Sequence, residues 1–225
     1  MYTGKCSIVI PAHNEEQTIR ECCLQLAADD RVSEVIVVAN ACTDATIAKA
    51  REGKATVIET DHKGKGNAIK VGIALAREEV ILLFDGDIQN PSNIYTSRLL
   101  AGMTSPDICL VKGTFDRSDQ PGPVTDILVK PSLRAANHPA SRINQPLSGM
   151  VAVRRSFALG IDIPDDFGVE IAMLLEAYKT PMRVVEVFLP KIAHSKRPWE
   201  HYVAMAHEIA ETLKRYGIIN PYEES

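Results

Sequence analysis

Short hydrophobic runs alternate with amphipathic stretches along the first half of the chain. Apolar residues at successive positions are typical of strands that are buried on both faces of a parallel sheet. Such strands are predicted at residues 6–10, 34–38, 55–58 and 80–84. Pro11 closes the first of them, and Asn14 is predicted to cap the helix that follows. Alternating strands and helices predict an α/β protein with a mainly parallel, doubly wound sheet and helices on both faces.

The second half continues with shorter predicted elements and one long amphipathic segment. Strands are predicted at 108–111, 148–153 and 183–189, and helices begin near Thr125 and Asp165. The polar segment 118–123 predicts a mobile surface loop. A C-terminal amphipathic helix is predicted over residues 199–216. Its apolar stripe favours packing on the parent domain, with a homodimer contact as the alternative. The stripe comprises Trp199, Tyr202, Val203, Ala206, Ile209, Ala210 and Leu213.

Composition excludes several classes of protein. The chain has 225 residues, is 45% hydrophobic and carries a formal net charge of −4, which argues against generic nucleic-acid binding. No apolar run approaches the roughly 18 residues that a membrane span needs. Five scattered cysteines without metal-finger spacing predict free thiols in a reducing compartment. The N-terminus is unlike a signal peptide. We therefore expect a soluble, cytoplasmic protein with no membrane span.

Two carboxylates end the predicted strand at 80–84. Asp85 and Asp87 belong at the carboxyl edge of the sheet, because a buried strand does not carry unpaired acids through the core. A divalent cation such as Mn²⁺ or Mg²⁺ neutralises two like charges that lie this close. Gly86 lets a diphosphate approach the backbone. The alternative is an acidic pair that only caps a turn.

Basic and acidic residues elsewhere predict further parts of a site. The turn at 63–66 has cationic side chains and backbone amides ahead of a helix, which favours phosphate binding over a solvated basic turn. His194 is a third metal ligand or a structural histidine, and imidazole would favour Mn²⁺. Lys196 and Arg197 would neutralise a departing phosphate. Glu170 accepts a proton or a hydroxyl hydrogen bond, or interacts only with the helix dipole.

The ordered set of short motifs resembles a known family of enzymes. The motifs at 11–16, 35–46, 64–68 and 84–87 are similar to the nucleotide-sugar domain of GT-A glycosyltransferases of family 2. The motifs at 111–115, 122–126, 145–149, 167–171 and 193–198 resemble those of the glucosyl-3-phosphoglycerate synthases, which are retaining and metal dependent. The match covers most of the chain.

This resemblance implies a fold, an activity and a division of the chain. It implies a GT-A fold with a nucleotide-sugar-binding half at 1–112, an acceptor-binding half at 113–198, and a C-terminal helix and tail at 199–225. The implied activity is metal-dependent transfer of a sugar from a nucleoside diphosphate, UDP-glucose, to a small hydroxyl acceptor with retention of configuration.

The resemblance also implies roles for individual residues. The donor site would comprise Pro11, Ala12, His13, Glu15, Asn40, Lys65, Asp85, Gly86 and Asp87. The acceptor site would comprise Gly122, Thr125, Gly149, Glu170, Lys196 and Arg197. Asp87 and His194 would bind the metal, and Glu170, Asp87 and Lys65 would act in catalysis.

The chain departs from the implied pattern in its acceptor half. Pro123 stands where the phosphoglycerate enzymes carry an arginine for the acceptor phosphate, and proline has no side-chain donor for phosphate. Two alternatives therefore stay open. The segment at 85–91 also resembles inverting polyprenyl-phosphate glycosyltransferases, and a catalytically inactive nucleotide-sugar-binding protein fits the altered acceptor half.

Overall fold

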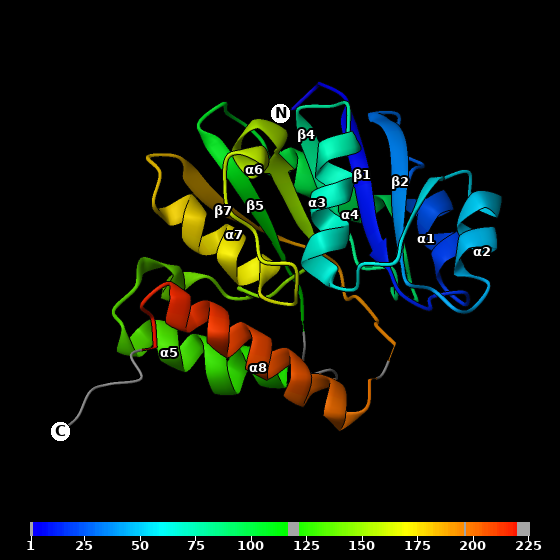
Figure 1. Ribbon diagram of the computed structural model, residues 1–225. Coiled ribbons are helices and arrows are strands. Elements are labelled where there is room, and N and C mark those ends of the chain that lie inside the picture. The colour runs from blue at the N-terminus through cyan, green and yellow to red at the C-terminus, as the bar shows by residue number, and fades with distance from the viewer. Residues whose placement is uncertain (1, 117–121, 196, 220–225) are drawn as a thin grey trace.

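The computed structural model describes residues 2–116, 122–195 and 197–219. Within them a seven-stranded sheet runs in the order β3-β2-β1-β4-β6-β5-β7 (Figure 1). The strands are β1 (Cys6–Ala12), β2 (Val32–Asn40), β3 (Thr56–Thr60), β4 (Val80–Leu83), β5 (Ile108–Thr114), β6 (Val151–Arg154) and β7 (Arg183–Phe188). β6 is antiparallel to β4 and β5, and the other described pairings are parallel. The prediction of a mainly parallel sheet is confirmed, and the parallel strands end at one common edge.

Helices cover both faces of the sheet. One face carries α1 (Ile19–Leu26), α2 (Thr46–Glu52) and α4 (Asn93–Gly102), and the other carries α3 (Lys65–Leu75), α6 (Arg155–Leu159) and α7 (Val169–Tyr178). Successive strand residues contribute to opposite cores: Ile81 lies in the core beneath α3 and α7, and Leu82 in the core beneath α1 and α4. Both are fully buried, which explains the continuous apolar run in the sequence.

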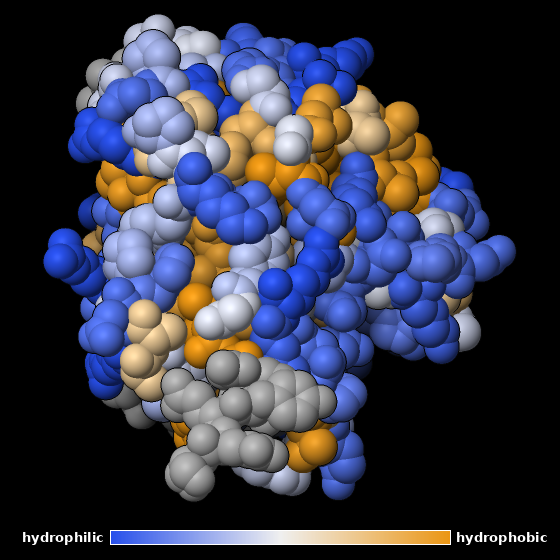
Figure 2. Space-filling model, turned by 60° about the vertical axis from the view of Figure 1, so that its left-hand side comes forward, coloured by the Kyte–Doolittle hydropathy of each residue, from blue (hydrophilic) through white to orange (hydrophobic). Residues whose placement is uncertain are grey.

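The remaining helices lie beyond the carboxyl edge of the sheet. They are a π-helical turn η1 (Thr125–Val129) that continues into α5 (Lys130–Ala135), a 3₁₀ turn η2 (Pro139–Arg142), and α8 (Trp199–Arg215). Figure 1 shows α5 and α8 below the edge at which the parallel strands end. Seen from the side of α5 and α7, most of the surface is hydrophilic, with smaller groups of hydrophobic residues between the polar ones (Figure 2).

Three details of the first half differ from the prediction. β1 continues through Pro11 to Ala12. β4 pairs with β1 only as far as Val9, so Pro11 is paired on one side alone, where a missing N–H is tolerated. Asn14 does not cap α1, which begins after Thr18. The φ of Asn14 is 57°, and its side-chain Oδ1 accepts a hydrogen bond from the Thr43 amide at 2.8 Å. α4 was not predicted, although Ser92 caps it by accepting from the Ile94 amide.

The amphipathic helix α8 packs on the domain along part of its length. Ile209 and Leu213 are fully buried in the core beneath α7, as the packing interpretation predicts. Trp199 and Val203 are 63% and 56% exposed, so packing on the parent domain does not extend to the N-terminal end of the stripe. The homodimer contact stays a prediction. No helix of the described residues is long and apolar enough to cross a membrane.

Candidate functional site

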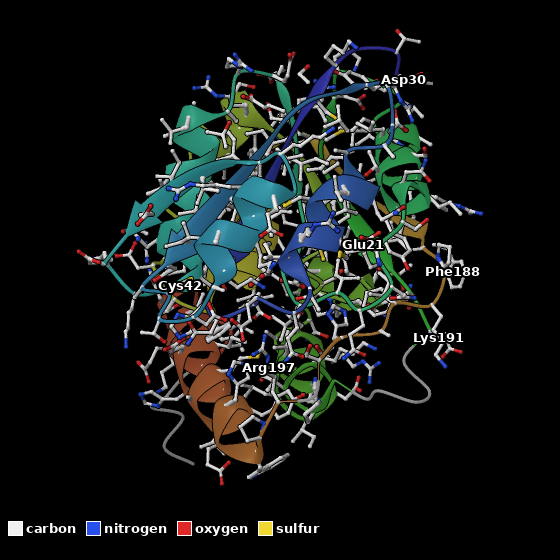
Figure 3. The ribbon with its side chains drawn as sticks, turned by 90° about the vertical axis from the view of Figure 1, so that its right-hand side faces the viewer. Glu21, Asp30, Cys42, Phe188, Lys191 and Arg197 are labelled. Atoms are coloured by element: carbon white, nitrogen blue, oxygen red, sulfur yellow. The ribbon has the colours of Figure 1, made fainter. Side chains whose placement is uncertain are left out.

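A cleft of about 740 Å³ lies between the carboxyl edge of the sheet and α8. The loops that follow β1, β2, β3 and β4 form one wall of it, as the sequence predicts for a doubly wound sheet. The start of η1 and the first two turns of α8 form the opposite wall. In Figure 3, Arg197 lies between the sheet with its flanking helices above and α8 below.

Hydrogen bonds to its backbone fix the acidic turn that follows β4. The Thr18 hydroxyl donates to the Gly86 carbonyl at 2.7 Å and so ties the turn to the start of α1. Ile88 forms an antiparallel bridge with His194, and the Ser195 amide donates to the Asp87 carbonyl at 3.2 Å. The turn and the segment that follows β7 are therefore held beside each other by main-chain hydrogen bonds.

This bridge brings the predicted metal ligands together. Asp85, Asp87 and His194 each offer a ligand atom, and these atoms lie within 4.8 Å of one another. The Nδ1 of His194 lies 3.2 Å from Oδ1 of Asp87. Two carboxylates and an imidazole are a donor set that suits Mn²⁺ and accommodates Mg²⁺. The residues present therefore fit a divalent ion.

Lys65, at the first position of α3, joins two acids. Its Nζ lies 2.7 Å from Oδ1 of Asp85 and 2.5 Å from Oε1 of Glu170. Burial lowers the pKa of Lys65, but the two carboxylates raise it by more, so that it lies above its usual range. Glu170 is 4% exposed and sits behind this ammonium group in the first turn of α7. Lys65 therefore stays protonated and holds both acids in place.

Glycines allow close approach at two points of the site. A Cβ at Gly149 would lie 2.5 Å from both carboxylate oxygens of Asp85, so this position has no room for a side chain. A Cβ at Gly66 would lie 1.9 Å from the Pro164 carbonyl oxygen. The amides of Gly66 and Asn67 already donate to the carbonyls of Asp166 and Asp165. The Gly66 amide is therefore engaged within the protein, and phosphate binding by the rest of the 63–66 turn, with the cationic side chain of Lys65, stays a prediction.

Arg197 links the loop after β1 to the acidic turn. Its Nη2 contacts Oε1 of Glu15 and lies 3.1 Å from Oδ2 of Asp87. Burial raises the pKa of Glu15 above its usual range, although the hydrogen bond from Arg197 opposes this. The guanidinium group thus balances two carboxylates that burial would otherwise leave close together.

Hydrogen bonds between loops hold the opposite end of the sheet-side wall. The Nδ1 of His13 donates to the Asn40 carbonyl at 2.6 Å, because a carbonyl only accepts. The side-chain amide of Asn40 donates to the Gly64 carbonyl at 2.5 Å, and Asn40 is 5% exposed. The loops after β1, β2 and β3 are therefore joined by hydrogen bonds at this end.

The structure brings together nearly all of the residues that the sequence singled out. The cleft is lined by the nine predicted donor-site residues and by Gly122, Thr125, His194 and Arg197. Gly149 and Glu170 lie just behind the lining, where they contact Asp85 and Lys65. Lys196 and residues 118–121 lie outside the described part of the chain.

Several residues of the site were not predicted. Lys112 on β5 is 1% exposed and its Nζ donates to the Ser148 carbonyl at 2.6 Å, next to Gly149. A lysine directly after an apolar run was the available signal. Aromatic residues of the second wall were also missed: Phe167, Trp199, His201 and Tyr202. The sequence pattern assigned two of these to a packing stripe, because spacing alone does not tell a core face from a cleft.

Comparisons with known proteins agree with this geometry. The model for the family Glycosyl transferase family 2 matches residues 7–159. Glucosyl-3-phosphoglycerate synthase of Mycobacterium tuberculosis is 29% identical to this chain over an aligned length of 238 residues. The alignment covers 94% of this chain and 74% of that protein.

Solved structures resemble nearly the whole chain. The crystal structure of the Mycobacterium tuberculosis enzyme with Mn²⁺, UDP-glucose and phosphoglyceric acid has a TM-score of 0.88 at 28% identity, covering 97% of this chain and 82% of that one. The same enzyme with Mg²⁺ and UDP has a TM-score of 0.87 at 28% identity, with coverage of 97% and 82%.

Proposed function

Because this chain belongs to glycosyl transferase family 2, we propose that it transfers glucose from UDP-glucose to a hydroxyl acceptor with a bound Mn²⁺ or Mg²⁺ ion. The predicted family and the predicted GT-A fold are confirmed, and the chain is a glycosyltransferase. The preference for UDP-glucose draws support from the Mycobacterium tuberculosis enzyme, whose structure contains that donor.

The contact between Asp87 and His194 carries the proposal. With Asp85 they form a cluster of oxygen and nitrogen donors that opens into the cleft. These three residues would hold the divalent ion. When bound, the ion supplies positive charge that offsets the negative charge growing on the leaving diphosphate.

Cationic side chains of the chain would bind the same diphosphate. Lys65 lies 2.7 Å from Asp85 and lines the cleft, so its ammonium group would face the phosphates from the α3 side. Arg197 would face them from the α8 side, where it lies 3.1 Å from Asp87. Their fixed positions would place charge without reorganisation during the reaction.

The two remaining parts of the substrate would occupy opposite ends of the cleft. Pro11, Ala12, His13 and Asn40 would surround the nucleoside, and Glu15 would keep Arg197 in position. Glu170 would accept a hydrogen bond from the acceptor hydroxyl at the other end. We propose retention of configuration, by likeness to the retaining phosphoglycerate enzymes, and proton NMR of the anomeric position of the product tests it.

The donor is tested by thermal shift and by turnover. UDP-glucose, UDP-galactose and GDP-mannose are added to the full chain with Mn²⁺ or with a chelator. Saturating UDP-glucose with Mn²⁺ should stabilise the protein by a few kcal/mol, and the chelator should remove the effect. A stronger response to GDP-mannose would overturn the UDP assignment. UDP binding without product, across acceptors and long incubation, would indicate an inactive binding protein.

A further inference from the structure

The two ends of the cleft differ in chemistry. The end formed by the loops after β1 to β4 carries carboxylates, lysines and buried amides. The end formed by η1, the loop before α7 and α8 is largely apolar. Its lining includes Pro123, Leu147, Phe167, Trp199, Tyr202 and Met205. The described lining residues of this end lie at 122–125, 147, 167 and 199–205. None of these lining residues carries a formal charge at neutral pH.

Aromatic rings form a continuous row at this end. The ring of Phe167 contacts His201 edge-on at 5.1 Å, and His201 contacts Tyr202 edge-on at 5.8 Å. Tyr202 in turn lies 6.3 Å from Trp199, whose side chain is largely exposed to solvent. The row runs from the segment that leads into α7 to the outer surface of α8. Aromatic rings offer a ligand flat, weakly polar faces.

The inner end of the row lies three positions before Glu170 in the sequence. Phe167 lies just before α7, and Glu170 lies in the first turn of that helix. The Phe167 amide donates to Oε2 of Glu208 on α8 at 3.0 Å, which joins the two segments. Burial lowers the pKa of His201, so this ring is neutral and offers a neutral hydrogen-bonding group.

Two of the three described lysine and arginine side chains of the cleft lining are engaged by carboxylates, and the third, Lys63, lies in the loop after β3 on the sheet-side wall. Lys65 contacts Asp85 and Glu170, and Arg197 contacts Glu15 and Asp87. A phosphorylated acid is bound by charge-assisted hydrogen bonds from arginine or lysine. Pro123 contributes a ring and no donor to the wall at this end. The chemistry of the wall thus suits an uncharged molecule better than a phosphorylated acid.

We propose that the acceptor is a neutral hydroxyl compound with an apolar ring face, which lies against Tyr202 and Trp199 and directs its hydroxyl toward Lys65, the lining residue in front of Glu170. A sugar ring and an aryl group share this chemistry, because both have a flat apolar face and no charge. The inference rests on the proposed glucosyl transfer and adds the class of acceptor.

Turnover with a panel of acceptors tests the proposal. The full chain with Mn²⁺ and UDP-glucose is given 3-phosphoglycerate, glycerol 3-phosphate, free saccharides, cyclitols, or aryl glucosides, and UDP release is measured. At least one neutral ring compound should give a kcat/KM tenfold or more above both phosphorylated compounds. Preference among saccharides, cyclitols and aryl glucosides then identifies the source of the ring. A tenfold preference for either phosphorylated compound overturns the proposal and leaves glucosyl transfer intact.

Variants of the aromatic row provide a second test. Trp199→Ala and Tyr202→Ala should each raise the KM for the preferred neutral acceptor about tenfold, and the KM for UDP-glucose less than twofold. Phe188→Ala is the matched control, since Phe188 is 60% exposed and lies at the outer edge of the molecule, away from Arg197 (Figure 3). An unchanged acceptor KM in both variants contradicts the proposal. Absence of both UDP-glucose binding and turnover in the unmodified chain would overturn the proposed function itself.

Discussion

The imidazole of His194 lies 3.2 Å from the carboxylate of Asp87, although 107 positions separate them in the sequence. The bridge between Ile88 and His194 fixes this contact, because it pairs the backbones of the two segments directly. A metal site built on main-chain hydrogen bonds is pre-organised, and its ligands need little movement to bind an ion.

Removal of either ligand should abolish metal-dependent turnover. Asp87→Asn and His194→Ala should each lower kcat/KM by roughly 10²-fold or more, because the charge on the leaving diphosphate loses its stabilisation. Calorimetric titration with Mn²⁺ in the presence of UDP checks the cause, and both variants should bind the metal more weakly. Asp30→Asn is the control, since Asp30 is exposed and lies at the opposite end of the molecule from Arg197 (Figure 3). Near-normal activity in both ligand variants would contradict the proposed mechanism.

The fit of Gly149 against Asp85 should be sensitive to a single methyl group. Gly149→Ala should lower kcat/KM by roughly 10²-fold, because the added Cβ meets the carboxylate and displaces it by about 1 Å. Overpacking should cost about 1–3 kcal/mol of unfolding free energy, measured by urea denaturation. At Gly160 the nearest atom to an added Cβ is 3.5 Å away, so Gly160→Ala is the matched control and should retain activity.

The Lys65–Glu170 pair should behave as a coupled unit. Lys65→Met leaves the buried carboxylate of Glu170 without this cation and should destabilise the fold by about 3–5 kcal/mol. The double variant Lys65→Met with Glu170→Gln should recover much of that stability and still lack activity. Urea denaturation of the single and double variants gives the coupling energy. Additive losses of stability would show that the two groups do not interact.

Lys112 should make the free energy of unfolding depend on pH in the alkaline range. Burial lowers the pKa of Lys112 to about 8, although Glu170 opposes this. Between about pH 8 and 10.5 the unfolded chain binds a proton that the folded chain does not, so folding becomes more favourable as pH rises. Relative to Lys112→Met, the unmodified protein should gain up to about 3 kcal/mol across this range. Urea denaturation of both proteins at pH 7.5, 9 and 10.5 measures this gain in the free energy of unfolding. A difference between the two proteins that stays constant with pH would contradict the lowered pKa of Lys112.

An arginine at position 123 should shift acceptor preference toward anions. Pro123 lines the cleft at the helical segment that leads into η1, where arginine is tolerated. Pro123→Arg should raise kcat/KM for 3-phosphoglycerate about tenfold relative to the neutral acceptor, since guanidinium binds phosphate through paired hydrogen bonds. Ile127→Arg adds the same charge to η1 at a residue that is 74% exposed. It should change kcat/KM for neither acceptor. An equal shift of acceptor preference in both variants would indicate that the added charge acts by general electrostatic attraction, whatever its position.

The sequence by itself determined the strands, the family and the acidic edge of the site. A continuous apolar run that ends in Asp85 and Asp87 is a local signal, because burial of both faces and the placement of acids at strand ends act on neighbouring residues. His194 was identified for the same reason, by its place after the last predicted strand.

The tertiary structure decided what depends on contacts between distant segments. The Gly66 amide is taken by a carbonyl a hundred positions later, and Arg197 reaches Glu15 as well as Asp87. The face of α8 divides into a buried end at Leu213 and a cleft end at Trp199. Helical spacing is identical for both ends, and only the packing of α7 and the position of the cleft distinguish them, because burial depends on which surface meets the helix.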